Sequence, residues 1–302
     1  MLVSGLSVIK NGVRLGYPFL ESIRSAIAIC DEFLVVVDKG EDETIDKLFE
    51  YKNSEPKLKI IETTWSDEVS PKKCVLAQQT NIGLHQSQGT WTLYLQANEV
   101  LHEKDLPELY KLLQKHKNNK EVEAMLFERL TFWGDYGSLV KTYPDRYKYT
   151  PRIIRSSIGT HSIRDAMSFA VFDNWSTRGR YPKSIDTGMD IYRYGKVLSS
   201  ELLQLKSREA VHEDNSRDKD YLSSAIPLAL LAGFKGTHPK VMDSLVENFE
   251  TEHSLRGREV ITFKERIRLI ESAYYKKIGV PCWRNKRYKL LGGYLPKERF
   301  DY

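Results

Sequence analysis

The sequence predicts an α/β protein with a mixed, mostly parallel sheet flanked by helices and a helical extension at its C-terminal end. Three observations lead to this prediction. Short β-rich runs alternate with segments of helical periodicity over roughly the first 130 residues. The clearest run, 32–37, is almost continuously apolar, as expected of a strand covered on both faces. Hydrophobic residues make up 41% of the 302 residues, which is ordinary for a globular chain with a large core.

Turn and cap signals separate the predicted elements. A loop signal at Asn11-Gly12 ends the first strand, and Ser70-Pro71 is a typical helix start. The run 91–95 is β-rich and breaks directly into polar residues. This order is typical of a Rossmann-like nucleotide-binding sheet. The predicted strands are 6–9, 32–37, 58–63, 91–95 and 122–127, and the predicted helices are 19–30, 44–51, 70–89 and 105–113.

The pattern changes after the alternating region. Residues 131–182 are rich in aromatic residues, Arg and Gly, and we interpret them as strands and site loops packed onto the sheet. Helical patterns follow, at 221–231, after Pro239, and after a capping box at Thr262 and Glu265. We therefore divide the chain into a domain at 1–205 and a basic helical extension at 206–302. Between 256 and 299, thirteen Lys or Arg stand against four Asp or Glu, although the whole chain carries only +5.

Composition excludes several classes of protein. No apolar run reaches the ~18 residues of a membrane span, and no basic region precedes the first apolar run, so we do not expect a secretory signal. Three widely spaced cysteines fit a reducing compartment and no zinc or disulfide framework. We expect a cytoplasmic protein whose basic extension permits peripheral membrane contact. The phosphate loop of NTPases, the glycine motif of most dehydrogenases and the nucleophile elbow of hydrolases are all missing.

Polar residues follow several predicted strands. The first strand ends near Asn11, the second ends at Asp38, and a helix carries Thr80-Asn81-Ile82-Gly83; the run 89–99 ends in Gln-Ala-Asn-Glu. In this order, residues 4 to about 110 resemble the family-2 glycosyltransferases of the GT-A fold, with Thr80 in place of the family's Arg. The likeness is weaker at 152–155 and 192–195. It implies transfer of a sugar, with inversion, from a nucleoside diphosphate sugar to a glycan, lipid-linked or other hydroxyl acceptor.

The same resemblance implies a set of donor-binding residues. Asp38 would contact the base or the ribose, since a carboxylate can accept hydrogen bonds from an imide N–H or from hydroxyls. A turn-forming aspartate is the simpler interpretation of the same residue. Asn81 is either a nucleotide contact or a solvent-facing residue. The nucleotide-sugar-binding residues implied in this way are Asn11, Asp38, Asn81, Gln96 and Asn98.

The position of the family's Asp-x-Asp motif is occupied by two amides, Gln96 and Asn98. In the family, the two carboxylates hold the ribose and a divalent Mn or Mg ion that bridges the diphosphate. Amides keep oxygen donors but lose two negative charges, so metal affinity should fall. Three outcomes are open: weak metal binding through Glu99, with His212 as a late ligand; stabilisation of the leaving group by Lys or Arg; or loss of activity. The cationic candidates at a helix start are Lys72 and Lys73.

An inverting transfer needs a carboxylate base on the acceptor side. The resemblance implies Asp165, and Asp145, Asp186 and Asp190 are alternatives. A second hypothesis is a non-catalytic nucleotide-sugar or glycan-binding module with a degenerate Asp-x-Asp, which would bind nucleotide without turnover. A nucleic-acid-binding protein led by the basic extension ranks last, because the strand-end residues give no reason for it, and no nucleic acid partner is expected.

Overall fold

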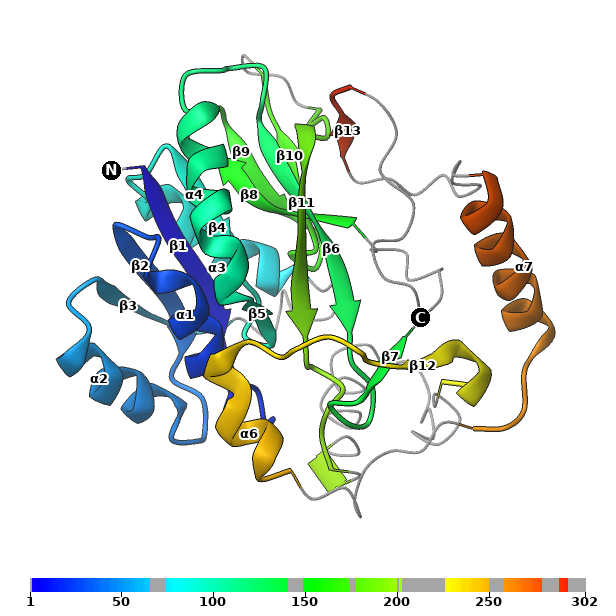
Figure 1. Cartoon of the computed structure of the whole chain (residues 1–302). Coiled ribbons are helices and arrows are strands. Elements are labelled where there is room, and N and C mark those ends of the chain that lie inside the picture. Colours follow the sequence, from blue (N-terminus) through cyan, green and yellow to red (C-terminus); the bar gives the residue numbers. More distant parts are fainter. Residues whose placement is uncertain are drawn as a thin grey trace.

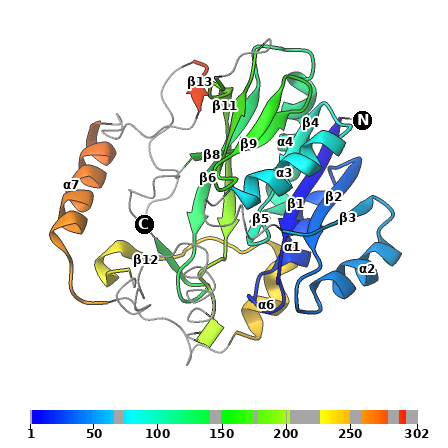
Figure 2. The same cartoon turned by 180° about the vertical axis from the view of Figure 1, so that it is seen from behind.

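The computed structural model describes residues 2–65, 74–140, 149–173, 178–199, 201–202, 226–249, 258–278 and 288–292. Figures 1 and 2 show a central sheet with helices on both faces. The helices are α1 (Phe19–Ile27), α2 (Thr44–Ser54), α3 (Val75–Gln86), α4 (Leu106–Lys115), α6 (Asp243–Glu247) and α7 (Phe263–Ile278). The strands are β1 (Val3–Ile9), β2 (Glu32–Asp38), β3 (Leu58–Thr63), β4 (Trp91–Tyr94), β5 (Glu99–Leu101), β6 (Ala124–Thr131), β7 (Ser138–Val140), β8 (Tyr149–Arg155), β9 (Thr160–Ile163), β10 (Ser168–Val171), β11 (Lys183–Arg193), β12 (Leu231–Gly233) and β13 (Lys289–Leu290).

The main sheet has the strand order β13-β11-β6-β8-β4-β1-β2-β3, and β5 pairs with β11. β1 is parallel to β2 and β4, and β2 is parallel to β3. β8 runs antiparallel between β4 and β6, after which β6, β11 and β13 are parallel again. The predicted mixed, mostly parallel sheet flanked by helices is therefore confirmed. Because β8 reverses direction, β1, β2, β3, β4, β6 and β11 all end at one edge, which we call the carboxyl edge.

Alternating residues of β2 show why its sequence is apolar throughout. Phe33, Val35 and Val37 point into one core, and Leu34 and Val36 point into the other. Helices α1, α2 and α4 cover the first core, whereas α3 and the β9–β10 hairpin cover the second. Each buried aliphatic or aromatic side chain stabilises the fold by roughly 1.5–3 kcal/mol.

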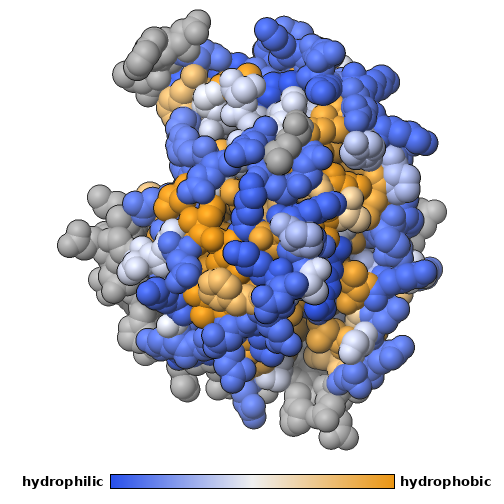
Figure 3. All heavy atoms as spheres, turned by 90° about the vertical axis from the view of Figure 1, so that its left-hand side faces the viewer, coloured by the Kyte–Doolittle hydropathy of each residue, from blue (hydrophilic) through white to orange (hydrophobic). Residues whose placement is uncertain are grey.

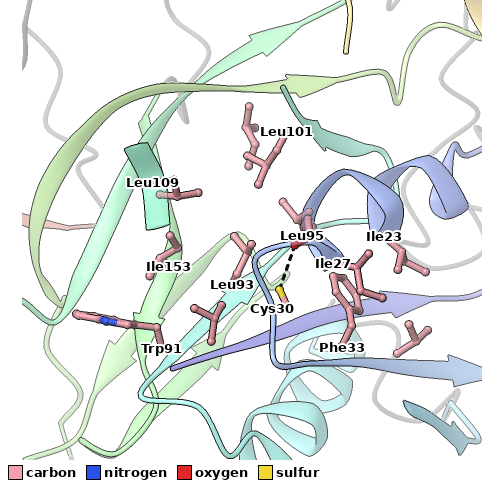
Figure 4. Packing of buried hydrophobic residues seen from close by; sticks show 14 of the residues in the cluster. Ile23, Ile27, Cys30, Phe33, Trp91, Leu93, Leu95, Leu101, Leu109 and Ile153 are labelled. Atoms are coloured by element: carbon pink, nitrogen blue, oxygen red, sulfur yellow. Dashed lines mark hydrogen bonds between the residues drawn. The ribbon is translucent and has the colours of Figure 1, made fainter. Parts of the chain in front are cut away.

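The first core also contains a cysteine, as Figure 4 shows. The thiol of Cys30 donates a hydrogen bond to the carbonyl oxygen of Ala26 at 3.3 Å. Burial raises the pKa of this thiol to about 12, so it packs as a small apolar group instead of a nucleophile. On the side of the molecule formed by β3 and α2, hydrophilic residues make most of the surface, with hydrophobic residues visible between them (Figure 3).

The predicted helix at 221–231 is wrong for its described part, which begins at 226. Pro227 has an extended backbone, with ψ 138°, and is followed only by a 3-10 turn at Leu228–Leu230 and by β12. β12 then pairs with β7, so tertiary pairing outweighs the helical pattern. The helix predicted after Pro239 is confirmed as a 3-10 turn, Lys240–Met242, leading into α6. Within the described ranges, no helix is both long and apolar enough to cross a bilayer.

A third core joins part of the predicted extension to the sheet. The fully buried Met242 contacts a cluster that includes Phe132 and Tyr194, and Val246 and Phe249 pack against the same cluster. The rings of Phe132 and Tyr194 stack at 4.8 Å between their centroids. Residues 226–249 therefore pack as part of the sheet domain, although we placed them in the extension.

Candidate functional site

Asn11 connects the exits of β1 and β2 at the carboxyl edge. Its φ of 49° lies in the left-handed region, which Asn tolerates better than most residues. Its Oδ1 accepts a hydrogen bond from the backbone N–H of Glu41 at 3.0 Å. Gly40, with φ 59°, makes this approach feasible, because a Cβ there would lie 2.5 Å from Asn11 Oδ1. Asn11 is buried, so it shapes this edge through the loop after β2.

Asp38 holds a second turn at the end of β2. Its Oδ1 accepts from the N–H of Gly40 at 2.8 Å and its Oδ2 from the N–H of Trp65 at 2.6 Å. Lys10 Nζ lies 3.8 Å from Asp38 Oδ1 and 5.2 Å from the centre of the Trp65 ring. The turn-forming role is thus the one that the contacts show. The turn also brings a carboxylate, an ammonium group and an indole face together at one strand end.

The amides of Gln96 and Asn98 lie between β4 and β5. Gln96 Nε2 donates to the sulfur of Met167 at 3.3 Å, and the Asn98 carbonyl accepts from the N–H of Tyr194 at 2.9 Å. The Asn98 side chain packs directly on Gly195, where a Cβ would lie 2.4 Å from Nδ2. Asn98 is 8% exposed, and its Oδ1 has no hydrogen-bond partner among the described residues. Leaving such a group unsatisfied costs about 1–3 kcal/mol, which a ligand hydroxyl would recover.

Glu99 lies in a buried ion pair. Arg152 Nε is 2.7 Å from Glu99 Oε2, Arg152 Nη2 is 2.8 Å from Oε1, and both side chains are fully buried. Burial alone would raise the pKa of Glu99, but the charge and hydrogen bonds of Arg152 bring it below its ordinary value. Because Arg152 binds both oxygens, the expectation that Glu99 serves as a metal ligand does not fit this geometry.

The position of Arg152 depends on an irregularity in β8. Met125 and Leu126 of β6 face Ile153 and Pro151, so Arg152 is an extra residue in the strand. Such a β-bulge re-aims a side chain and is common beside functional sites. Pro151 fits there, since a bulge interrupts the regular ladder of hydrogen bonds. The bulge therefore directs Arg152 toward Glu99.

A half-buried cation, Lys196, follows Gly195, on which Asn98 packs. Lys196 follows the end of β11, and its Nζ lies 5.6 Å from the centre of the Trp133 ring. Burial lowers the pKa of Lys196, and the neighbouring charge of Arg193 lowers it further. Trp133 Nε1 is buried and has no hydrogen-bond partner within the described chain. An anion at this place would both restore the pKa of Lys196 and accept hydrogen bonds from these donors.

Asp165 lies in the tight turn between β9 and β10. The turn is closed by the pairing of Ile163 with Ser168, and it contains two non-glycine residues with positive φ, Arg164 at 60° and Ala166 at 55°. Asp165 Oδ1 accepts from the N–H of Met167 at 3.4 Å. Since the sulfur of Met167 contacts Gln96, the turn places Asp165 close to the end of β4.

The charge of Asp165 also acts on the buried ion pair. Burial alone would lower the pKa of Arg152, but Glu99 raises it, and Tyr94 and Asp165 add to the rise. Asp165 is only partly buried, whereas Glu99 is inaccessible. Among these two carboxylates, Asp165 is therefore the one that an acceptor hydroxyl can reach.

Asn81 has a structural role that fastens this turn to α3. Its Oδ1 accepts from the N–H of Ser162 at 2.7 Å, and its Nδ2 donates to the carbonyl of Ser162 at 3.1 Å. Both ends of the amide thus bind the backbone of β9. Asn81 is half-buried and supports this turn, and its expected contact with a nucleotide stays a prediction.

Removing this link should loosen the hairpin that carries Asp165. We expect Asn81→Ala to lower the free energy of unfolding by about 1–3 kcal/mol, because Ser162 loses two hydrogen bonds. Urea unfolding measures this change. Gln78→Ala, an exposed position on the same helix, is the matched control and should change stability by less than about 0.5 kcal/mol. Equal stability of the two variants would contradict this role of Asn81.

The other predicted residues fall into two groups. His212, Lys72, Lys73 and Asp145 lie outside the described residues. Asp190 is buried on β11, where it pairs in register with Glu128. Within the described ranges, no group of three or more His, Cys, Asp or Glu residues could hold a metal ion.

The sequence interpretation missed four residues at this edge, for two different reasons. Lys196 follows a strand with a Tyr-Arg-Tyr-Gly sequence, and that signal could have identified it. Trp65 and Trp133 each come just after a strand, as the donor-binding candidates do. The partnership of Arg152 with Glu99 has no local signal, because it joins segments 53 residues apart.

Comparison with known proteins gives a partial likeness in structure. No protein-family model matches the chain, and no curated protein does. Crystal structures of S. aureus TarS are similar to part of it. TarS 1–349 in complex with UDP matches at 18% identity over 52% of this chain and 48% of that chain, with a TM-score of 0.38. A longer TarS structure matches at 14% identity over 74% of this chain and 42% of that chain, with a TM-score of 0.41.

A third structure, TarS 1–349 in complex with UDP-GlcNAc, matches at 18% identity over 52% of this chain and 46% of that chain, with a TM-score of 0.38. The chain therefore spans less than half the length of each of these structures. Similarity at this level does not assign the chain to a family.

Proposed function

We propose that this protein is a glycosyltransferase that moves a sugar from a nucleoside diphosphate sugar to a glycan or other hydroxyl acceptor, with inversion. One observation carries the proposal. Asn98, whose buried Oδ1 has no partner among the described residues, packs on Gly195, the residue before the half-buried Lys196, and the Asp165 turn contacts the same strand end through Gln96. This transfer requires an oxygen that accepts a hydrogen bond from a donor hydroxyl, a cation for the leaving group, and an accessible carboxylate as the base.

Two groups of side chains at the carboxyl edge offer chemistry that suits parts of a nucleotide-sugar donor. At the β2 end, the indole of Trp65 offers a face for a planar base, and Lys10 and Asp38 offer charged groups at its border. At the β11 end, Lys196 would neutralise the diphosphate, and Asn98 Oδ1 would accept a hydrogen bond from a ribose or sugar hydroxyl. Parallel strands whose carboxyl ends meet at one edge form the usual place for such a ligand.

The described residues at this site do not fit a divalent cation. Arg152 binds both oxygens of Glu99, and the former Asp-x-Asp carboxylates are the neutral amides Gln96 and Asn98. We therefore assign to Lys196 the stabilisation of the negative charge on the leaving group. This is the second of the three outcomes left open by the sequence. Lys72 and Lys73, the cationic candidates from the sequence, lie outside the described residues.

The transfer step then follows from these positions. The acceptor oxygen attacks the anomeric carbon, and the carboxylate of Asp165 takes the hydroxyl proton. The bond between the anomeric carbon and the phosphate oxygen breaks, and its electron pair leaves with the nucleoside diphosphate. Lys196 stabilises the negative charge that builds up there.

A nucleotide panel tests the proposal. UDP and UDP-GlcNAc, the ligands named for the similar TarS structures, are the first probes, followed by GDP, CMP and dTDP, each with and without Mn²⁺. We expect at least one nucleoside diphosphate to raise the thermal midpoint without metal, since a ligand at a hundredfold excess over Kd stabilises by about 2.7 kcal/mol. If no nucleotide shifts the midpoint under either condition, the proposal fails.

The replacement of both Asp-x-Asp carboxylates by amides favours a second candidate, a non-catalytic nucleotide-sugar or glycan-binding module. The two candidates differ in turnover. If the protein is an enzyme, Asp165→Asn should lower the transfer rate by about 10²–10⁴-fold while leaving nucleotide binding unchanged. A binding module would bind the nucleotide sugar without hydrolysing or transferring it, and Asp165→Asn would change nothing.

A further inference from the structure

Helix α7 exposes an apolar stripe. Phe263, Ile267, Ile270 and Tyr274 are 76%, 41%, 69% and 50% exposed. Their spacing of four, three and four residues places them on one face of the helix. In a globular protein such a stripe normally faces the core, so this helix presents to solvent the face that should be covered. Figures 1 and 2 show α7 at the side of the molecule opposite α2.

The N-terminus of α7 is capped by side-chain hydrogen bonds. The N–H and hydroxyl of Thr262 both donate to Glu265 Oε2, at 2.8 and 2.7 Å, and the N–H of Glu265 donates back to Thr262 Oγ1 at 3.4 Å. This confirms the predicted capping box. Arg258 also forms an ion pair with Glu265. The stripe therefore belongs to a capped helix of 16 residues, about 24 Å long at 1.5 Å per residue.

The charge of this helix identifies the kind of surface that would cover the stripe. Its sequence holds five basic residues against two acidic ones, and it lies within the strongly basic region 256–299. An anionic bilayer offers apolar depth and negative charge together. Nucleic acid offers phosphates but no apolar layer to bury the stripe. The basic residues of the helix are Lys264, Arg266, Arg268, Lys276 and Lys277.

We propose that α7 binds an anionic membrane surface, lying in the plane of the bilayer with Phe263, Ile267, Ile270 and Tyr274 buried in the headgroup region. Such helices combine an apolar face with a polar face rich in Lys and Arg. Each basic residue near an anionic surface contributes attraction, and each buried apolar side chain adds an attraction that salt does not screen. This inference does not depend on the proposed transfer of a sugar.

Vesicle co-sedimentation of the full chain tests the proposal. The two vesicle types are phosphatidylcholine alone and phosphatidylcholine mixed with phosphatidylglycerol. We expect binding to the mixed vesicles, little binding to the neutral ones, and partial loss at high salt. Phe263→Ser/Ile270→Ser removes apolar surface without changing charge and should weaken binding by at least about tenfold, since 1.4 kcal/mol corresponds to a factor of ten.

Two controls separate docking from folding. Phe49→Ser removes a 40% exposed aromatic side chain from α2 and should bind as the wild type does. Ile270→Ser alone, at a position 69% exposed, keeps the proposal testable if the double variant loses helical circular dichroism. The proposal is overturned if the wild-type protein does not bind anionic vesicles or binds neutral ones equally well. It is also overturned if the variants that lack the stripe bind as the wild type does. Salt-sensitive RNA binding without vesicle binding would overturn it too.

Discussion

Replacing Lys196 with Met should slow sugar transfer by about 10²–10³-fold, the usual cost of removing one group that stabilises a developing negative charge. The same substitution should not destabilise the fold. Burial and Arg193 already disfavour the charged form of Lys196, so an apolar side chain of similar length relieves an unfavourable interaction in the free protein. Activity is therefore expected to fall while stability does not. If Lys196 had only a structural role, the two would fall together.

Steady-state kinetics and urea unfolding of the same preparation measure the two effects. Lys120→Met, at an exposed lysine away from the carboxyl edge, is the matched control and should leave both unchanged. A Lys196→Met protein that transfers sugar at the wild-type rate would remove Lys196 from the mechanism. A loss of activity accompanied by an equal loss of stability would indicate a structural role instead.

Replacing Arg152 with Met should lower the free energy of unfolding by about 3–5 kcal/mol, because it leaves Glu99 as an uncompensated buried charge. Glu99→Met should cost a similar amount by leaving Arg152 unpaired. The double variant Glu99→Met/Arg152→Met should recover most of the loss, since two apolar side chains can replace a buried pair at little net cost. Urea unfolding of the four proteins forms a double-mutant cycle. A double variant whose loss equals the sum of the single losses would contradict this coupling.

The same pair predicts a dependence of stability on pH. The pKa of Glu99 is lowered in the folded protein from an ordinary value of 4.5, chiefly by Arg152 acting against the effect of burial. A carboxyl with a lowered pKa binds protons more readily in the unfolded chain, so its contribution is fully present above about pH 4.5. It is lost as pH falls through the folded-state pKa, and a protein with Glu99→Met should not show this part of the loss.

Local sequence patterns predicted the elements whose burial follows from their own periodicity. The continuous apolar run of β2 and the Thr262–Glu265 box both specify their structures within a few residues, and both are confirmed. The run 221–231 failed in its described part because pairing with β7 outweighed helical spacing. Bulges such as the one at Arg152 depend on the register of a partner strand and leave no local signal.

The place where the strand-end residues gather was predictable from the sequence, but the contacts of the individual side chains were only partly so. The polar residues after β1, β2 and β4 do collect at one edge, because parallel strands end together there. The roles of individual side chains depended on partners distant in sequence. Asn81 binds Ser162 and Glu99 binds Arg152, so both side chains are engaged by protein partners that the local sequence does not reveal.

A crystal structure of the protein with a bound nucleoside diphosphate is the most direct test of the central claim. The diphosphate should lie beside Lys196, with a ligand hydroxyl donating to Asn98 Oδ1. A nucleotide found on another surface, or crystals that take up none of the five ligands of the panel at saturating concentration, would contradict the assignment of the carboxyl edge as a donor site.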